Sequence, residues 1–369
     1  MDTKDPFLTA QLITYLGNKR SLLPFLGRGV ERVQEKLGKK KLRILDGFSG
    51  SGVVSRLLKT QASFLWANDL EDYCEALNKC YLANRSEVDL EGIKKTAASL
   101  EGRKLEGRKS PGFIEKNYAP KNDTDIRAGE RVFYTNRNAK ILDNLKALIF
   151  KEIPETERHF FLAPLLVQAS IHTNTSGVFK GFHKKDGLGC FGGRGENALD
   201  RIKKEISLQA PVLAKAECEV RVTKMDVNAL VRKAAAKEEF DLAYFDPPYN
   251  QHPYGSNYFM LNLLANKAEG VAIQDGVSGI PKKWKHSSYN GARKARQAME
   301  QLLADTPAKY ILISYNEEGI ISVDDFRSTL EKFGDCELMA QDYNVYRGSR
   351  NLSGRGLKVK ELLWILKKK

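Results

Sequence analysis

Short apolar runs alternate along the chain with amphipathic stretches in which apolar residues recur every three or four positions. The apolar runs predict buried strands at residues 41–45, 63–67 and 240–245. The helical period predicts helices at residues 21–38 and 73–85. In the first part of the chain, strand, turn and helix therefore follow one another in the order of a nucleotide-binding α/β corner.

The middle of the chain has a different pattern. Residues 87–130 are polar, charged and rich in glycine, and we expect an irregular surface segment there. Apolar helices are predicted at residues 138–149 and 157–171, and a polar, aromatic and basic stretch follows at residues 172–195. We therefore expect a mainly helical and irregular insertion over residues 86–214.

Apolar runs return in the last third of the chain. Residues 218–223 and 309–314 predict further strands, and residues 258–265 predict a helix. The final two runs, at residues 337–346 and 361–366, predict a terminal antiparallel hairpin.

The tetrapeptide Asp246-Pro247-Pro248-Tyr249 directly follows the strand predicted at residues 240–245. Proline has a fixed φ and no backbone N–H, so two in succession form a stiff turn whose carbonyl groups are free to accept hydrogen bonds. A carboxylate beside that turn and an aromatic ring after it suit a planar amine, such as N6 of adenine. A strand that merely ends at a proline turn with a surface aspartate is the simpler alternative.

A glycine-rich turn follows the first predicted strand, with the sequence Asp46-Gly47-Phe48-Ser49-Gly50-Ser51-Gly52. Glycines let the backbone approach a ligand closely, and an acid beside them suits the ammonium of S-adenosylmethionine (SAM), which carries no phosphate. The spacing lacks the third glycine of a dinucleotide fingerprint, and the chain has no phosphate-binding loop. Asp69 ends the second strand, where doubly wound folds hold a ribose diol. Tight packing of strand against helix is the alternative explanation of these glycines.

Composition narrows the class of protein. With 369 residues, 42% of them hydrophobic, the chain is long enough for one large domain with an insertion or for two domains. No apolar run is long enough to cross a bilayer and the N-terminus lacks a signal-peptide pattern, so we expect a cytoplasmic protein. The five cysteines and five histidines lack the spacing of metal ligands, so we expect no metal. A net charge of +14 favours a polyanionic partner.

Together these motifs resemble those of the Dam-type, alpha-group adenine-N6 DNA methyltransferases, with a likeness to enzymes from restriction–modification systems. The resemblance spans roughly residues 11–85 and 215–369. The run after Tyr249 is longer and more polar than in Dam itself, so the GATC specificity of Dam is not implied. The residues that carry the resemblance are Tyr15 and Lys19, then Asp46, Phe48, Gly50 and Gly52, and finally Asp246 to Tyr249.

The resemblance implies a Rossmann-like SAM-dependent methyltransferase fold, a doubly wound mixed sheet that ends in an antiparallel hairpin. Residues 1–85 and 215–369 would form the SAM-binding catalytic domain, and residues 86–214 an inserted target-recognition region. It further implies SAM as methyl donor, S-adenosylhomocysteine as product and no metal. The implied cofactor-binding residues are Tyr15, Lys19, Asp46, Phe48, Ser49, Gly50, Gly52, Asp69 for the ribose, Asp226 for the adenine amine of SAM, and Asp246. The implied catalytic residues are Asp246, Pro247, Pro248 and Tyr249.

Two basic regions contain candidate DNA contacts. A glycine-rich loop with basic and aromatic residues suits the reading of base edges and insertion beside a flipped base, although a flexible surface loop has the same composition. The connection of the terminal hairpin is also basic, and we expect it to meet phosphate. The candidates are Asn174, Lys180, His183, Lys184, Lys185 and Arg194 in the first region and Arg347, Arg350 and Arg355 in the second.

The implied function is SAM-dependent methylation of adenine N6 in a specific double-stranded DNA sequence, by base flipping. A cognate restriction endonuclease is a candidate partner, and the oligomeric state, monomer or dimer, is left open. An RNA adenine-N6 methyltransferase is one alternative, although Asp rather than Asn at the start of the tetrapeptide favours DNA. An inactive nucleic-acid-binding regulator is another, and the intact tetrapeptide argues against it. The missing third glycine disfavours an NAD-dependent oxidoreductase.

Overall fold

The computed structural model describes most of the chain: residues 5–106, 110–196, 198–248, 251, 253–268, 270–317, 319–344 and 358–369. Four of the predicted site residues lie outside the described residues, namely Tyr249, Arg347, Arg350 and Arg355. Within these ranges, no helix is long and apolar enough to cross a membrane.

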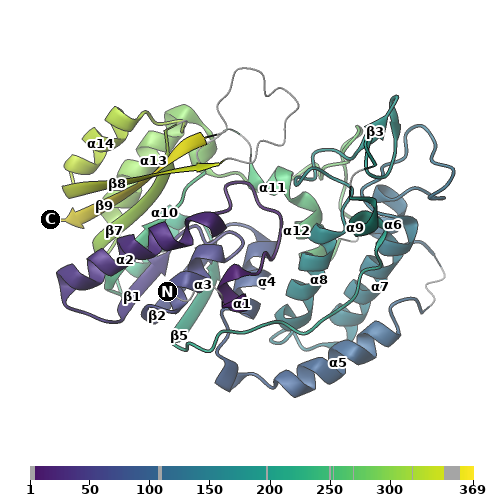
Figure 1. The fold of residues 1–369 in the computed structure, drawn as a ribbon, viewed down its shortest axis with the longest axis horizontal. Helices are drawn as coiled ribbons and strands as arrows, with labels where there is room; N and C mark the ends of the chain where they lie inside the picture. Colours follow the sequence, from purple (N-terminus) through teal and green to yellow (C-terminus); the bar gives the residue numbers. More distant parts are fainter. Residues whose placement is uncertain are drawn as a thin grey trace.

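A seven-stranded sheet forms the centre of the molecule (Figure 1). Its strands are β1 (Leu42–Asp46), β2 (Ala62–Asp69), β5 (Glu219–Lys224), β6 (Phe240–Phe245), β7 (Ala308–Asn316), β8 (Gly334–Asn344) and β9 (Lys358–Lys368). The order across the sheet is β5-β2-β1-β6-β7-β9-β8. The first five strands are parallel, and β9 is antiparallel to both β7 and β8. This topology confirms the predicted doubly wound mixed sheet with its C-terminal hairpin.

The central strands are buried on both faces, because successive side chains of a strand point to opposite sides. In β6, Leu242 and Tyr244 pack in one core, and Ala243 and Phe245 pack in the other. Burial on both faces explains why these strands are continuous apolar runs in the sequence. The first core is covered by α2 (Leu23–Leu37) and α3 (Val53–Lys59), and the second by α10 (Val227–Ala234), α13 (Ala292–Asp305) and α14 (Val323–Glu331).

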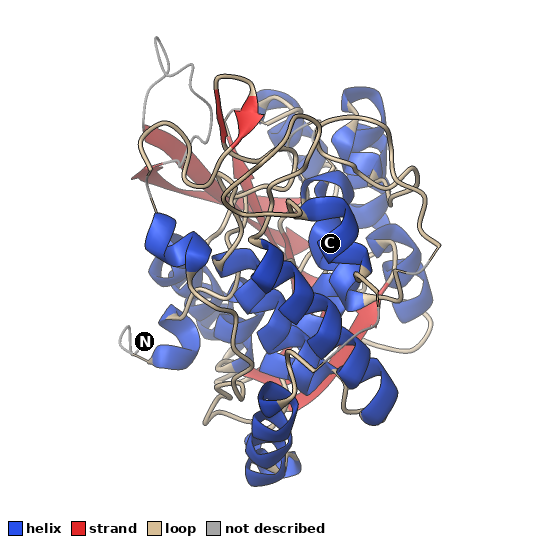
Figure 2. Ribbon diagram, turned by 90° about the vertical axis from the view of Figure 1, so that its right-hand side faces the viewer, coloured by secondary structure: helices blue, strands red, loops and turns tan. Residues whose placement is uncertain are grey.

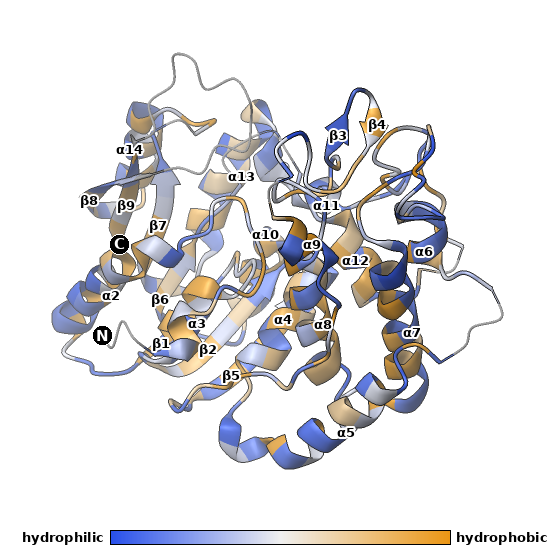
Figure 3. Ribbon diagram, turned by 45° about the vertical axis from the view of Figure 1, so that its right-hand side comes forward, coloured by the Kyte–Doolittle hydropathy of each residue, from blue (hydrophilic) through white to orange (hydrophobic). Residues whose placement is uncertain are grey.

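A helical lobe stands beside the sheet in Figure 1 and faces the viewer in Figure 2. Its core contains α4 (Asp72–Tyr81), α5 (Leu90–Gly102), α6 (Phe113–Tyr118), α7 (Asn136–Glu152), α8 (His159–Ile171) and α12 (Phe259–Ala265). Helices α4, α8 and α12 pack against one another, and many of their apolar residues lie in this shared core (Figure 3). These observations confirm the helices predicted at residues 138–149, 157–171 and 258–265. The helix predicted at residues 21–38 is also confirmed, as α2.

The prediction of an irregular segment at residues 87–130 is wrong at α5 and at the short helix α6. Residues 90–102 form α5, in which Ile93, Ala97 and Leu100 recur with helical spacing and are buried. Asp89 caps this helix by accepting a hydrogen bond from Gly92 N at 2.9 Å. The charged residues that suggested irregular structure form the exposed face of an amphipathic helix.

Shorter elements connect the sheet and the lobe. They are α1 (Pro6–Thr9), α9 (Leu199–Lys203), α11 (Tyr254–Asn257), the 3-10 turns at Arg20–Leu22, Arg85–Glu87 and Ser288–Asn290, and the small hairpin of β3 (Lys184–Lys185) and β4 (Leu188–Gly189). At the carboxyl edge of the sheet, Asp46 pairs with Ala67 of β2 and Tyr244 of β6. Residues that end the parallel strands therefore meet at one edge of the sheet.

Candidate active site

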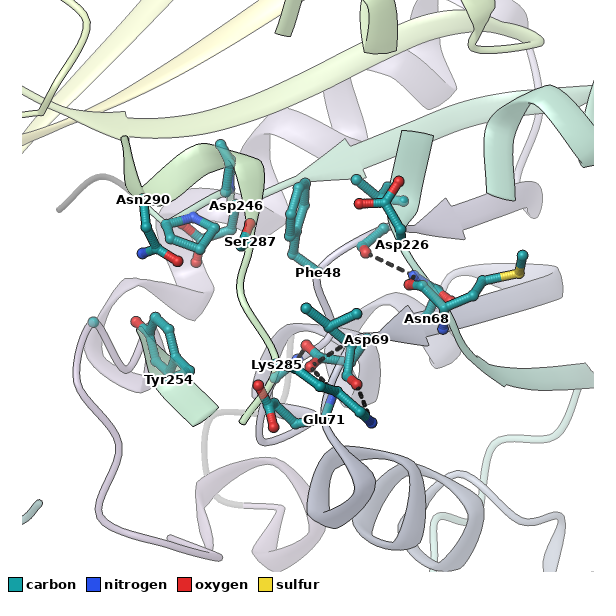
Figure 4. A pocket seen from close by; sticks show the side chains of 18 of the residues that line it. Phe48, Asn68, Asp69, Glu71, Asp226, Asp246, Tyr254, Lys285, Ser287 and Asn290 are labelled. Carbon is teal, nitrogen blue, oxygen red and sulfur yellow. Dashed lines mark hydrogen bonds between the residues drawn. The ribbon is translucent and has the colours of Figure 1, made fainter. Parts of the chain in front are cut away.

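A pocket opens at the carboxyl edge of the sheet (Figure 4). It lies between the turns that follow β1, β2, β5 and β6, the segment before α2 and the loop between α12 and α13. Eight residues predicted from the sequence line it: Tyr15, Phe48, Gly50, Asp69, Asp226, Asp246, Pro247 and Pro248. The other predicted cofactor residues, Lys19, Asp46, Ser49 and Gly52, are buried behind its wall.

The turn after β1 is shaped by glycine and held by a neighbouring side chain. Gly50 has a φ of 51°, and a Cβ there would stand 3.0 Å from the ring of Tyr15, so a larger residue would be strained and would crowd the pocket wall. Asn78 donates to the carbonyl oxygen of Gly50 at 3.2 Å and to Oγ of Ser49 at 3.0 Å. These hydrogen bonds from Asn78 fix the path of the turn without any contribution from a ligand.

The carboxylate of Asp69 is bound by main-chain amides. Its Oδ2 accepts from Gly50 N at 2.8 Å, and its Oδ1 accepts from Leu70 N at 2.8 Å and Glu71 N at 3.0 Å. Burial raises the pKa of Asp69, and the backbone donors oppose that rise. Asp69 therefore ties the turn after β1 to the turn after β2 while it lines the pocket.

Asp46 is fully buried at the end of β1. Its Oδ2 accepts from the Ser55 hydroxyl at 2.6 Å, whereas its Oδ1 has no hydrogen-bond partner among the described residues. Burial raises the pKa of Asp46 to about 7, against the effect of the Ser55 hydrogen bond. A buried carboxylate oxygen without a donor favours a positively charged group nearby.

Phe48 and Asp226 form the end of the pocket next to α10. Asp226 is exposed and caps α10, where its carboxylate accepts from Ala229 N at 3.0 Å. Phe48 packs edge-on against Tyr289 and Phe245, with ring centroids 5.2 and 6.2 Å apart. Figure 4 shows the Phe48 ring between Asp226 and Asp246, so the ring separates the two acidic ends of the pocket.

Asp246 stands directly after β6, at the other end. Its Oδ1 lies 3.3 Å from Nζ of Lys19, an ion pair without the alignment of a hydrogen bond. The same Nζ lies closer to Oε1 of Glu361 in β9, at 2.7 Å. Burial raises the pKa of Asp246 to about 7; the Lys19 ammonium opposes this rise and the Glu361 carboxylate adds to it.

Three tyrosines join the pocket to the helical lobe. The Tyr258 hydroxyl accepts from Leu16 N at 2.7 Å, and the Tyr254 hydroxyl donates to the Leu16 carbonyl at 2.9 Å. The ring of Tyr15 stacks on that of Tyr258, with centroids 5.0 Å apart, and lies 5.0 Å from that of Tyr254. The segment that follows the tetrapeptide therefore holds the N-terminal wall of the pocket through both main-chain polar groups of one residue, Leu16.

Sequence motifs missed the wall formed by Glu71, Lys285, Ser287 and Asn290. Lys285 donates to the Leu70 carbonyl at 2.7 Å and pairs with Asp72 at 2.9 Å, which anchors the loop between α12 and α13 to the start of α4. The basic cluster at residues 282–296 was the only signal for this loop, and no spacing rule connects it with β2.

Glu71 is a buried carboxyl group in that wall, 3% exposed. It accepts a hydrogen bond from Asn262 of α12 at 2.6 Å. Burial raises the pKa of Glu71 to about 7; the Asn262 bond opposes this rise and the nearby Asp69 adds to it. Glu71 therefore joins the strand edge to the helical lobe and changes charge near neutral pH.

The predicted DNA-contact loop has a buried part and an exposed part. Asn174 is fully buried, donates to the carbonyls of Val132 and Cys190 at 2.8 and 2.9 Å, and accepts from Gly192 N at 3.0 Å. The structure thus gives Asn174 a role in shaping the loop, and its buried side chain is out of reach of DNA. The side chains of Lys180, Lys185 and Arg194 are exposed, whereas those of His183 and Lys184 are half-buried.

Comparison with known proteins places the chain among methyltransferases. The family model described as D12 class N6 adenine-specific DNA methyltransferase matches residues 15–329. The chain is similar to the type II methyltransferase M.NlaIII of Neisseria lactamica, with 28% identity over 363 residues that cover 96% of this chain and 99% of that protein. It is also similar to the type II methyltransferase M.CviAII of Paramecium bursaria Chlorella virus 1, with 27% identity and coverage of 96% and 98%.

A longer relative matches in part. The modification methylase StsI of Streptococcus sanguinis is 28% identical over 372 residues, which cover 96% of this chain but 52% of that protein. This chain therefore spans about half the length of StsI and nearly all the length of M.NlaIII and M.CviAII.

Proposed function

Because the chain belongs to the D12 class of N6 adenine-specific DNA methyltransferases, we propose that the pocket at the carboxyl edge of the sheet is its active site, with Asp246 as the acceptor for the adenine amine. The protein is an enzyme that methylates adenine N6 in DNA, and the family implies SAM as the methyl donor. Membership selects DNA over RNA and an enzyme over an inactive regulator. One observation carries the site assignment: predicted residues from five separate segments of the chain line one pocket.

The donor side of the pocket, formed by the turns after β1, β2 and β5, fits SAM. Asp46 lies behind the glycine turn with its Oδ1 unpartnered in the described structure, so its negative potential favours the ammonium at this end. Asp69 would accept from a ribose hydroxyl, since each carboxylate oxygen can take more than one donor. Asp226, on the far side of Phe48, would accept from the adenine amine of SAM. Bound SAM supplies a methyl group on a positively charged sulfur.

The acceptor side, at the end of β6, would prepare the target adenine. The lone pair of its amine is delocalised into the ring, so Asp246 and the Pro247 carbonyl would accept from the amine and draw the nitrogen towards tetrahedral geometry. Asp246 would also stabilise the positive charge that develops on nitrogen. The bond from N6 to the methyl carbon forms as the bond from sulfur to that carbon breaks, and the surplus amine proton leaves to water. Orientation of the two reactants supplies much of the acceleration.

The DNA would approach the basic side of this edge. A target base inside a duplex cannot reach the pocket, so it would be flipped out, with Tyr249 stacked on it. Phosphate contacts suit the net charge of +14. The candidate contacts are the accessible Lys180, Lys184, Lys185, Arg194 and His183 and, outside the described residues, Arg347, Arg350 and Arg355.

The test compares Asp246→Ala with Asp335→Asn, a change to an exposed carboxylate of β8. Methyl transfer from SAM to an adenine-containing duplex is measured in single turnovers. We expect Asp246→Ala to lower the rate by about 10²–10⁴-fold, because the amine loses its charged acceptor, and Asp335→Asn to leave it unchanged. Turnover of Asp246→Ala at the wild-type rate would refute the assignment.

The recognition sequence calls for a second experiment. Methylation-sensitive sequencing of DNA from cells that express the protein reports the modified base, its position and the sequence around it. A single recurrent sequence with N6-methyladenine is the expected result, because the relatives include type II methyltransferases. A cognate restriction endonuclease and a cytoplasmic location stay predictions.

A further inference from the structure

Lys19, Asp246 and Glu361 form a buried group beneath the proposed active site, which we call the ammonium cluster. The three residues come from the segment before α2, the turn after β6 and strand β9. Lys19 is 3% exposed and Glu361 is fully buried. One buried ammonium group therefore lies between two carboxylates, of which Glu361 is enclosed and Asp246 borders the pocket with 19% of its side chain exposed.

The ammonium is shared unequally. Nζ of Lys19 is 2.7 Å from Oε1 of Glu361 but 3.3 Å from Oδ1 of Asp246. The Ser314 hydroxyl of β7 donates to the same Oε1. Glu361 is thus the principal holder of the ammonium, and Oδ1 of Asp246 accepts no hydrogen bond from the described residues.

Other ionisable groups face the cluster from neighbouring strands. Tyr244 of β6 and Tyr343 of β8 lie beside it, and burial raises the pKa of each phenol, so both stay neutral at neutral pH. Asp46 of β1 is near enough for its charge to repel that of Asp246. Among the described residues, Lys19 is therefore the cation that neutralises this cluster, and Glu361 competes with Asp246 for it.

A purely structural ion pair would need one carboxylate. Removing a second carboxylate from water costs free energy, and a well-packed apolar residue at that position would stabilise the fold at least as well. Glu361 also lies beyond residues 15–329, to which the family model extends. Its presence in the cluster is better explained by an effect on Asp246.

We propose that Glu361 is a positioning residue for methyl transfer: by holding the Lys19 ammonium, it limits the pull of that ammonium on the buried Oδ1 of Asp246 and so keeps the carboxylate a strong acceptor for the target amine. This inference rests on the proposed function of Asp246. Without Glu361, the ammonium would move onto Oδ1, turn the carboxylate towards itself and withdraw negative charge from the oxygen that meets the amine. The negative charge of Glu361 also disfavours ionised Asp246, so its removal would extend the ionised range to lower pH.

The decisive variant is Glu361→Gln, with Glu337→Gln as the matched control. Glu337 is a half-exposed carboxylate of the same hairpin that pairs with Arg32 and Lys36. Single-turnover rates are measured from pH 5.5 to 9. For Glu361→Gln we expect a plateau rate about tenfold lower, and an acid limb shifted by about one unit to lower pH. The control should show neither change.

Two further measurements separate the outcomes. Glu361→Asp keeps the charge but draws it back by one methylene, so its acid limb should shift in the same direction and by less; this variant serves if Glu361→Gln does not fold. Infrared difference spectra against Asp246→Asn follow the Asp246 carboxyl directly and need no turnover. If the wild-type protein failed to methylate adenine, that result would refute the proposed function. It would not bear on the Asp246 titration, which is measured separately. An Asp246 titration that is unchanged in both Glu361 variants, with only their melting temperatures lowered, overturns the positioning role.

Discussion

The two sides of the pocket hold their carboxylates in different ways. On the donor side, Asp69 accepts from three main-chain N–H groups, and Asp226 accepts from a fourth at the start of α10. On the acceptor side, Asp246 meets the side-chain ammonium of Lys19, which Glu361 holds more closely. Main-chain donors are fixed by the fold, whereas a lysine side chain can move between partners. The donor side is therefore rigid by construction, and the acceptor side is adjustable.

The largest expected effect comes from removing the cation of the acceptor side. Lys19→Met leaves the buried Glu361 and the partly exposed Asp246 without their counter-charge, which should lower the free energy of unfolding by about 3–5 kcal/mol at pH 8. The pKa of Asp246, already about 7, would rise further, so the folded state would bind its proton more tightly than the unfolded state. Stability should therefore fall as the pH rises through neutrality. Urea denaturation at pH 6 and pH 8 measures both the loss in the free energy of unfolding and its dependence on pH.

A matched lysine variant is the control for this prediction. Lys332→Met removes an exposed ammonium that pairs with Glu300, and we expect little change at either pH. If Lys19→Met were as stable as this control at pH 8, the cluster would not depend on its cation, and the contrast between the two sides would fail.

A smaller effect should separate the binding of SAM from the methyl-transfer step. Asp69→Asn replaces one acceptor oxygen with an NH₂ group that faces main-chain donors, so the turn must rearrange. We expect the dissociation constant for SAM to rise by about 10–100-fold, with a much smaller change in the single-turnover rate at saturating SAM. Asp246→Asn should lower the single-turnover rate strongly and change the dissociation constant for SAM much less. Calorimetric titration with SAM and rate measurements on both variants test the distinction, which collapses if both variants lose affinity alike.

The smallest effect concerns stability alone. Glu71 has a pKa raised to about 7 by burial, so the stability that its proton confers is fully present below about pH 4.5 and is lost as the pH rises through 7. Gln cannot ionise and can still accept from Asn262, so Glu71→Gln should raise the free energy of unfolding at pH 8 by about 1–3 kcal/mol. The gain should shrink towards pH 5 in denaturation curves of the protein without ligand.

Glu75 lies on the same side of α4, and its replacement should change the free energy of unfolding in the opposite direction. Burial acts to raise the pKa of Glu75, but Lys79 and Lys224 outweigh it and the pKa is lowered. Glu75→Gln should therefore lose stability at pH 8, and a gain in both variants would point to a general effect of reducing charge.

Local sequence was enough to predict that residues now proposed for the donor side would lie together at one edge of the sheet. Asp46 to Gly52 are contiguous and Asp69 ends an apolar run, so strand ends and turns indicated their places, as they did for Asp246 on the acceptor side. The ammonium cluster could not be predicted in the same way, because it depends on the pairing of β9 with β7 and on a lysine near the other end of the chain. Within its basic surroundings, Glu361 has the pattern of a solvated charge.

Burial of polar residues explains the other difference from prediction. Asn174 sits in a stretch whose composition suggests an exposed loop, yet its amide satisfies main-chain groups of two other segments inside the lobe. Composition describes which groups a loop carries, but it does not say which of them must pair with buried carbonyls. The exposed Lys180, Lys185 and Arg194 of the same region keep their predicted place on the surface.

The position of β9 in the sheet has a consequence for synthesis on the ribosome. In the described sheet, β8 lies at the edge with β9 as its neighbour, although β8 is translated first. Strand β8 therefore has no place to pair until the final strand emerges and inserts beside β7. A growing chain can form the first five strands earlier, since domains fold from the N-terminus at about 5–20 residues per second. Glu361 arrives with that last insertion, so in a nascent chain the turns after β1, β2 and β5 would form before the ammonium cluster is complete.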